Sequence, residues 1–358
     1  MLRKPYFDIL RVTAILLVLI NHLPIYRLYM YESGMAEAGC LLISVITRIN
    51  VPLFAMISGA LLLGREESYG EIWKKRMKNM LLVTVGCSAL LYVAFGLLRD
   101  RDLSLDTFLY GLLAGNLKDF DSYWFLYAYI GFLLFLPLYR HIAQQMTKGD
   151  FCLLLGVHAT LTTVLPLINI LFKSLGLQQL AVSSSISTTI AVTPLVFYPL
   201  IGYYVDKKIN VTAISRKVWT ALGIATALGI AITAAVVFAE GKTWGFSQHL
   251  LNMFTFIIVT VFFLVIKRLY HQSEGNSPTL FVRIMAFLSP LCFGIYLLDP
   301  VLKLAIYEPL KSALRPSIGL SGFSLVMCIV SFACCSAVTW CFLKLRKRVT
   351  THTPKVSK

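Results

Sequence analysis

Long apolar runs separated by short polar segments dominate the pattern of this chain. Each of ten runs comes near the length of about 20 residues that a helix needs to cross a bilayer. They span approximately residues 7–26, 40–63, 79–98, 122–139, 151–171, 188–205, 217–238, 248–266, 281–303 and 318–343. The pattern predicts an all-α, polytopic integral membrane protein with about ten transmembrane helices.

Composition agrees with a membrane protein. Of the 358 residues, 58% are hydrophobic and only 14% are charged, whereas roughly 25% of the residues in a soluble domain are charged. The first run follows Arg3 and Lys4 as a signal peptide would, but no small-residue cleavage site comes after it, so we expect a permanent anchor. We expect one membrane domain over residues 1–345 and a basic, disordered cytoplasmic tail over residues 346–358.

The distribution of basic residues predicts the topology. When alternate connections are assigned to opposite sides, one side receives 22 of the 33 Lys and Arg residues, the other side receives 9, and 2 lie inside spans. Short cytoplasmic loops are rich in Lys and Arg, so both termini are expected on the cytoplasmic side. Topology therefore explains the net charge of +16 better than nucleic-acid binding does. The eight cysteines show no spacing of a zinc site, so we expect no metal.

Two polar residues in the first span, Arg11 and His22, need an explanation. An arginine at the centre of a membrane helix costs about 2.5–3.5 kcal/mol on insertion scales. His22 follows Arg11 by eleven positions, which places both side chains within roughly 20° of one helix face, about 16 Å apart. That distance is on the order of the reach of a pantetheine arm, so a coenzyme A with phosphates near Arg11 could present its thioester near His22. The alternatives are an ion pair between Arg11 and Asp8 and a packing role for His22.

Polar and aromatic residues in three later spans extend this hypothesis. Arg48 lies beside Pro52, and a proline bend next to an intramembrane arginine suggests the lining of a cavity. Asp299 is expected at the depth of His22, where it either orients the imidazole of a general base or pairs with Lys303. Tyr123 and Trp124 open the fourth span. They either stack on a sugar or belong to an aromatic interface belt.

Four features occur in a fixed order along the chain. Arg11 and His22 have ten residues between them, and RINVPLFAMISGALLLG, SYWFLYAYIGFLLFLPLY and FGIYLLDP follow. Together they resemble the acyltransferase-3 family of bacterial membrane acyltransferases over residues 5–345. The RINVPLFAMISG stretch is most similar to O-acetyltransferases of surface polysaccharides, such as the type that acts on enterobacterial common antigen.

The resemblance implies an enzyme of the bacterial cytoplasmic membrane. Such an enzyme transfers an acetyl or other short acyl group from acyl-CoA to a hydroxyl of a lipid-linked or cell-surface glycan. It implies that His22 is the general base or acyl relay, that Arg11 binds the coenzyme and that Arg48 is essential. Ser122 and Asp299 stand where many members have histidines, which leaves the acceptor sugar and the acyl group open.

In the resulting hypothesis Arg11 and the basic segment around residues 74–78 attract the phosphates of the donor. Arg48 stabilises the oxyanion at the thioester carbonyl. The rivals are a transporter or flippase of lipid-linked glycans and a membrane sensing module that binds a ligand without turnover. Consumption of acyl-CoA distinguishes the enzyme from both.

Overall fold

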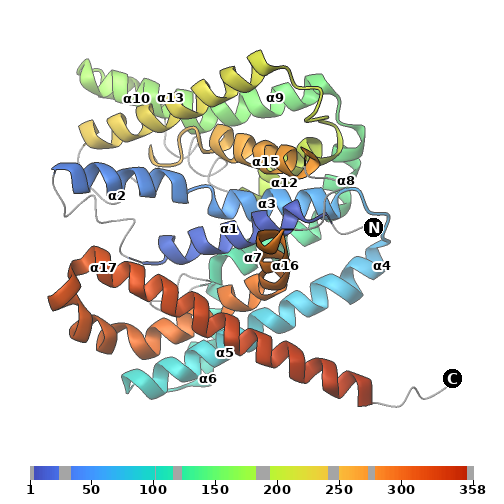
Figure 1. Cartoon of the computed structure of the whole chain (residues 1–358), viewed down its shortest axis with the longest axis vertical. Helices are drawn as coiled ribbons and strands as arrows, with labels where there is room; N and C mark the ends of the chain where they lie inside the picture. Colours follow the sequence, from blue (N-terminus) through green and yellow to red (C-terminus); the bar gives the residue numbers. More distant parts are fainter. Residues whose placement is uncertain are drawn as a thin grey trace.

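The computed structural model describes residues 4–23, 34–100, 102–115, 123–182, 194–240, 250–272 and 279–352 (Figure 1). Every regular element in these residues is helical and none is a strand, as the apolar pattern predicts. In chain order the elements are α1 (Tyr6–Asn21), α2 (Gly34–Thr47), α3 (Asn50–Leu62), α4 (Tyr69–Glu71), η2 (Ile72–Met77), α5 (Lys78–Arg99), α6 (Leu105–Ala114), α7 (Trp124–Leu134), α8 (Leu136–Gln145), α9 (Lys148–Ala159), η4 (Thr160–Val164), α10 (Leu165–Ser174), η5 (Gln178–Leu180), α12 (Pro194–Lys207), α13 (Arg216–Glu240), α15 (Thr255–Gln272), α16 (Leu280–Leu288), η6 (Ser289–Leu291) and α17 (Cys292–His352).

The helices include several long apolar stretches, so the protein is a multi-pass membrane protein. Within the described residues, six stretches are long and apolar enough to cross a membrane: Gly34–Leu62, Tyr69–Arg99, Lys148–Ser174, Arg216–Glu240, Thr255–Gln272 and Leu280–Arg348. The pair α7 and α8, bent by 66°, adds a seventh if it forms one span. The bend coincides with Pro137, which removes a backbone donor from the helix.

The predicted total of ten spans differs from these six or seven for two structural reasons. Helices α1 and α12 have 16 and 14 described residues, fewer than these stretches. In addition, the stretch Leu280–Arg348 covers two predicted spans. Within it, Gly319 has a φ of 68°, a left-handed conformation that glycine adopts without strain. Figure 1 shows that α17 reverses its direction.

The ends of the chain bear on the predicted topology. Helix α1 begins and α17 ends toward the same right-hand side of Figure 1, an arrangement that an even number of crossings requires. The number of crossings and the cytoplasmic location of both termini stay predictions. Helix α17 continues to His352, so residues 346–352 of the expected disordered tail are helical. Residues 353–358 lie outside the described part of the chain.

Helix α1 lies at the centre of the bundle, between two buried clusters of apolar side chains. Leu10 and Ala14 belong to a large cluster with residues of α3, α12 and α15. Ile15 and Leu19 belong to a second cluster with residues of α5, α7 and α17. Because its apolar side chains are shared between two cores, the remaining face of α1 is where polar side chains meet the interior of the bundle.

Helices α3 and α12 cross with their backbones in close contact. A Cβ atom added at Gly59 would overlap the backbone of Pro199, and one added at Gly202 would overlap the backbone of Met56. Small residues permit such a close approach of two helices inside a membrane. This contact fixes α3, whose two ends contribute to the cavity described below.

Candidate functional site

A cavity of about 530 Å³ runs along α1. Its walls come from α1, from α3 and the segment that follows it, from η2 and the start of α5, from α7, and from the junction between α16 and α17. The residues that line it are Arg11, Val18, Asn21, His22, Asn50, Val51, Phe54, Ile57, Ser58, Leu61, Leu62, Arg65, Arg76, Met80, Trp124, Phe125, Leu126, Tyr129, Ser289, Pro290, Cys292, Phe293 and Tyr296. The cavity therefore contains both Arg11 and His22, the two residues that the spacing places on one helix face.

His22 caps the C-terminal end of α1 and forms a pair with Asp299 of α17. The backbone N–H of His22 donates to the carbonyl of Val18 at 2.9 Å. Its Nδ1 lies 3.0 Å from Oδ2 of Asp299, a side chain that is only 1% exposed. Because an ionised carboxylate only accepts hydrogen bonds, Nδ1 is the donor in this contact, and a neutral His22 would keep its lone pair on Nε2. The pair has the arrangement of an oriented general base.

Asp299 also bonds to Lys303, the partner that the alternative interpretation assigns to it. The Nζ of Lys303 donates to the same Oδ2 at 2.8 Å. The two interpretations are thus not exclusive, because one carboxylate oxygen receives both donors.

Arg11 contacts Asp8 and also lines the cavity, and its predicted binding of a coenzyme stays a prediction. Its Nη1 lies 3.7 Å from Oδ1 of the buried Asp8 and 3.3 Å from Oγ of Ser289. The expected ion pair is therefore present at the long end of the range, and the guanidinium also lines the cavity. Arg11 can reach a bound anion without leaving this environment.

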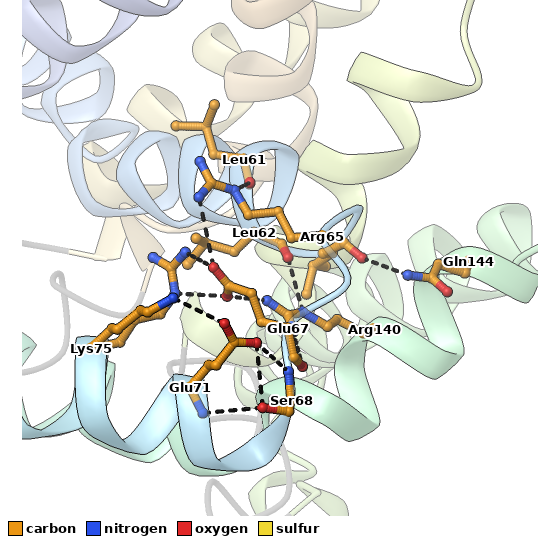
Figure 2. Close-up of polar contacts among 11 residues, drawn as sticks. Leu61, Leu62, Arg65, Glu67, Ser68, Glu71, Lys75, Arg140 and Gln144 are labelled. Atoms are coloured by element: carbon orange, nitrogen blue, oxygen red, sulfur yellow. Dashed lines mark hydrogen bonds and ion pairs between the residues drawn. The ribbon is translucent and has the colours of Figure 1, made fainter. Parts of the chain in front are cut away.

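Two further arginines, Arg65 and Arg76, line the cavity near the end of α3. Both contact the carboxylate of Glu67, which Figure 2 shows together with Arg65 and Arg140. Arg76 donates to Glu67 from Nη2 at 2.6 Å and from Nε at 2.9 Å, and Arg140 donates from Nη2 at 2.7 Å. The Nη1 of Arg65 lies 3.8 Å from the same carboxylate. Three guanidinium groups around one carboxylate leave an excess of two positive charges here.

The charge of Glu67 is strongly stabilised by this surrounding. Hydrogen bonds from Arg76, the largest cause, and from Arg140 lower the pKa of the Glu67 carboxyl to about 2. The residue therefore stays ionised throughout the physiological range, so that it holds the arginines in place at any pH at which the protein works.

The same side chains cap the C-terminal end of α3. Arg65 Nε donates to the carbonyl of Leu61 at 2.9 Å, and Arg140 Nε donates to the carbonyl of Leu62 at 3.1 Å. Gln144 Nε2 donates to the carbonyl of Leu63 at 3.2 Å (Figure 2). The last carbonyls of a helix lack partners within it and attract cations. Capping thus fixes the segment that carries Arg65 and Glu67.

The two aromatic residues proposed to contact a sugar have different surroundings. Trp124 is 39% exposed and lines the cavity. Tyr123 is 3% exposed, and its hydroxyl donates to the carbonyl of Leu297 at 2.6 Å. Its ring packs against Tyr296, which lines the cavity in its place. Tyr123 thus supports the wall from behind, and its contact with a sugar stays a prediction.

Arg48, like Tyr123 and Asp299, is not among the residues that line the cavity. It lies at the break between α2 and α3, and its neighbour Asn50 lines the cavity instead. Oδ1 of Asn50 accepts from the backbone N–H of Val51 at 2.6 Å. The side-chain amide of Asn50 thus lies at the cavity wall, and a polar residue two positions before Pro52 was the available sequence signal. Ser122 lies outside the described residues.

Metal ligands and related proteins complete the description of the site. In the described residues, no group of three or more His, Cys, Asp or Glu side chains could hold a metal ion.

No curated protein and no solved structure matches this chain at a significant level. The family model of an acyltransferase domain, by contrast, matches residues 4–343. Because this match covers almost the whole chain, including every residue of the cavity, the protein belongs to the acyltransferase-3 family of membrane acyltransferases.

Proposed function

We propose that this acyltransferase transfers an acetyl or other short acyl group from acyl-CoA to a hydroxyl of a cell-surface or lipid-linked glycan, in the cytoplasmic membrane of a bacterium. The observation that carries the proposal is the His22–Asp299 pair, which opens onto the cavity that Arg11, Arg65 and Arg76 also line. A general base and an anion-binding cluster in one cavity suit a reaction between a hydroxyl and an anionic donor.

His22 acts as the general base. Asp299 holds Nδ1–H, so Nε2 takes the proton of the acceptor hydroxyl as its oxygen attacks the thioester carbonyl. The carbon–sulfur bond then breaks and the leaving thiolate takes that proton from His22, which restores the neutral imidazole. The buried carboxylate stabilises the imidazolium while it carries the proton.

The arginines suit the other end of the donor. Coenzyme A carries its phosphates far from its thiol, and guanidinium groups bind phosphate through paired hydrogen bonds. Arg11 is about 16 Å from His22 along α1, a separation on the order of the length of a pantetheine arm. Tyr129 lines the same cavity as Arg11 and Arg76.

Trp124 and Asn50 are the groups proposed for the remaining tasks. The partly exposed indole of Trp124 offers a surface on which a sugar ring can stack. Arg48 was expected to stabilise the oxyanion, and Asn50 reaches the cavity from the adjoining turn. We therefore assign the oxyanion to Asn50 and retain for Arg48 a role in fixing that turn.

The test is turnover of acetyl-CoA by the purified protein, with release of free thiol as the readout. The wild type should release thiol slowly, and faster with a glycan acceptor. His22→Ala should lower the rate by about 10²–10⁴-fold, the usual contribution of a general base. His141→Ala, at an exposed position on α8, is the control and should leave the rate unchanged. A wild type that neither releases thiol nor binds coenzyme A would refute the proposal and support a transporter of lipid-linked glycans.

A further inference from the structure

One oxygen atom of Asp299 accepts two hydrogen bonds, one from His22 at the end of α1 and one from Lys303 in α17. His22 Nδ1 lies 3.0 Å and Lys303 Nζ lies 2.8 Å from Oδ2. The other oxygen, Oδ1, is buried and has no hydrogen-bond partner among the described residues. An ion pair that served stability alone would gain more by satisfying both oxygens, because a buried acceptor without a partner destabilises the fold. The actual arrangement links the ammonium directly to the atom that holds the imidazole.

The charges of the three groups balance only when His22 is neutral. The carboxylate of Asp299 and the ammonium of Lys303 then cancel, and a buried group of zero net charge is the cheapest to keep in a membrane. The titratable neighbours that also interact with Asp299 are Tyr123, Cys328 and Cys335. A phenol and two thiols carry no charge at neutral pH, so in the described surroundings Lys303 supplies the compensating charge.

We propose that Lys303 is a positioning residue of the acyl transfer. It holds the Asp299 carboxylate against His22 and offsets its negative charge, which keeps the imidazole in the neutral form that can accept a proton. Without the ammonium, the buried carboxylate would hold His22 as the imidazolium, which cannot act as a base. The inference rests on the proposed function, because it assigns Lys303 a task in the reaction that His22 and Asp299 perform.

The geometry of α17 supports this assignment. Lys303 follows Asp299 by four positions and so lies on the same face of the helix. Its side chain is 15% exposed, compared with 1% for Asp299. Pro300 lies between the two residues and fixes the local backbone. The ammonium is therefore confined beside the carboxylate rather than free to move into solvent.

The test is a double-mutant cycle on the full-length protein, with kcat and KM for acetyl-CoA as readouts. Lys303→Met should lower kcat by about 10-fold and leave KM unchanged, because the donor does not touch this residue. Lys303→Arg keeps the charge and should retain most of the activity. In the Asp299→Asn background, the same Lys303→Met substitution should change kcat by less than about twofold, since Lys303 acts only through the carboxylate.

Lys311→Met is the matched control, since Lys311 forms an exposed pair with Glu308 on the same helix, at 3.3 Å. It should leave kcat unchanged. The inference is overturned if Lys303→Met has the kcat of the wild type. It is also overturned if the losses of Lys303→Met and Asp299→Asn simply multiply, or if Lys303→Arg is as impaired as Lys303→Met. If Lys303→Met does not fold, the kcat of Lys303→Arg and the kcat values in the Asp299→Asn background still test the inference. A wild type without thiol release would refute the proposed function instead.

Discussion

At the scale of single residues, the site depends on short hydrogen bonds between groups far apart in sequence. His22 ends the first helix and Asp299 lies in the last one, yet Nδ1 and Oδ2 are 3.0 Å apart. The aspartate gives His22 an acidic partner, so the proposed chemistry depends on a carboxylate in the membrane interior.

We expect Asp299→Asn to lower kcat by about 10²-fold without changing KM for the donor. The amide can still accept from Nδ1–H, but it lacks the charge that stabilises the imidazolium, and a loss confined to the chemical step lowers kcat. Steady-state kinetics of thiol release at several donor concentrations measure both constants. An increase in KM alone would show that Asp299 shapes donor binding instead.

A substitution of Arg76 tests the part of the cavity in which we propose that the donor phosphates bind. We expect Arg76→Gln to raise KM for acetyl-CoA about 10-fold, equivalent to about 1.4 kcal/mol, because one guanidinium that faces the phosphates is lost. Acetyl-pantetheine has no nucleotide, so its KM should be the same for wild type and variant. Equal increases for both donors would place the phosphates elsewhere and make Arg76 a structural residue.

At the scale of elements, the end of α3 combines helix capping with charge. Arg65 and Arg140 cap carbonyls of α3 and also contact Glu67 (Figure 2). The segment that follows α3 is therefore fixed by the same contacts that surround Glu67 with guanidinium groups. This coupling predicts a pH dependence of stability.

Glu67 should stabilise the fold in a manner that is lost in acid. Its carboxyl has a pKa of about 2 in the folded protein, compared with an ordinary value of 4.5. The folded state therefore binds a proton less readily, so the stabilisation is complete above about pH 5 and disappears as the pH falls toward 2. The melting temperature of Glu67→Gln should lie below that of the wild type at pH 7, and the two should converge near pH 2. Glu66→Gln, at an exposed neighbouring position, should melt like the wild type at every pH.

The crossing of α3 and α12 makes a second prediction about elements. Gly59→Ala should lower the free energy of unfolding by about 1–3 kcal/mol or more, the range for overpacking, because the added methyl group overlaps the backbone of Pro199. Thermal unfolding in detergent measures the effect. Gly86→Ala introduces a methyl group with no atom within 4 Å and should be neutral. Equal stability of both variants would show that the two helices separate easily.

At the scale of the whole molecule, the open question is how the bundle crosses the membrane. The start of α1 and the end of α17 lie toward one side of Figure 1, and the basic residues predict that this side is cytoplasmic. We expect a fluorescent protein fused to either terminus to fold and fluoresce, and alkaline phosphatase fused there to be inactive. Phosphatase activity at one terminus would mean an odd number of crossings.

The sequence by itself determined the fold class and the membrane environment, and it placed Arg11 and His22 on one helix face. Hydrophobic run length reflects the thickness of the bilayer, and the helical repeat alone places Arg11 and His22 on one face. Run length and helical repeat are both local properties of the chain, so they can be recognised without a structure. Close helix contact at Gly59 and the bend at Pro137 follow from residue type in the same way, once the helices are known.

Only the tertiary structure decided which polar residues share the cavity. It joined His22 to Asp299 and Lys303, buried Tyr123 behind the wall, and brought Asn50 to the cavity in place of Arg48. It also singled out Arg76 from a run of basic residues. These outcomes depend on how each helix is rotated and where it bends against neighbours distant in sequence. The periodic pattern of a sequence fixes which residues share a helix face, but tertiary packing fixes which neighbouring residues that face contacts.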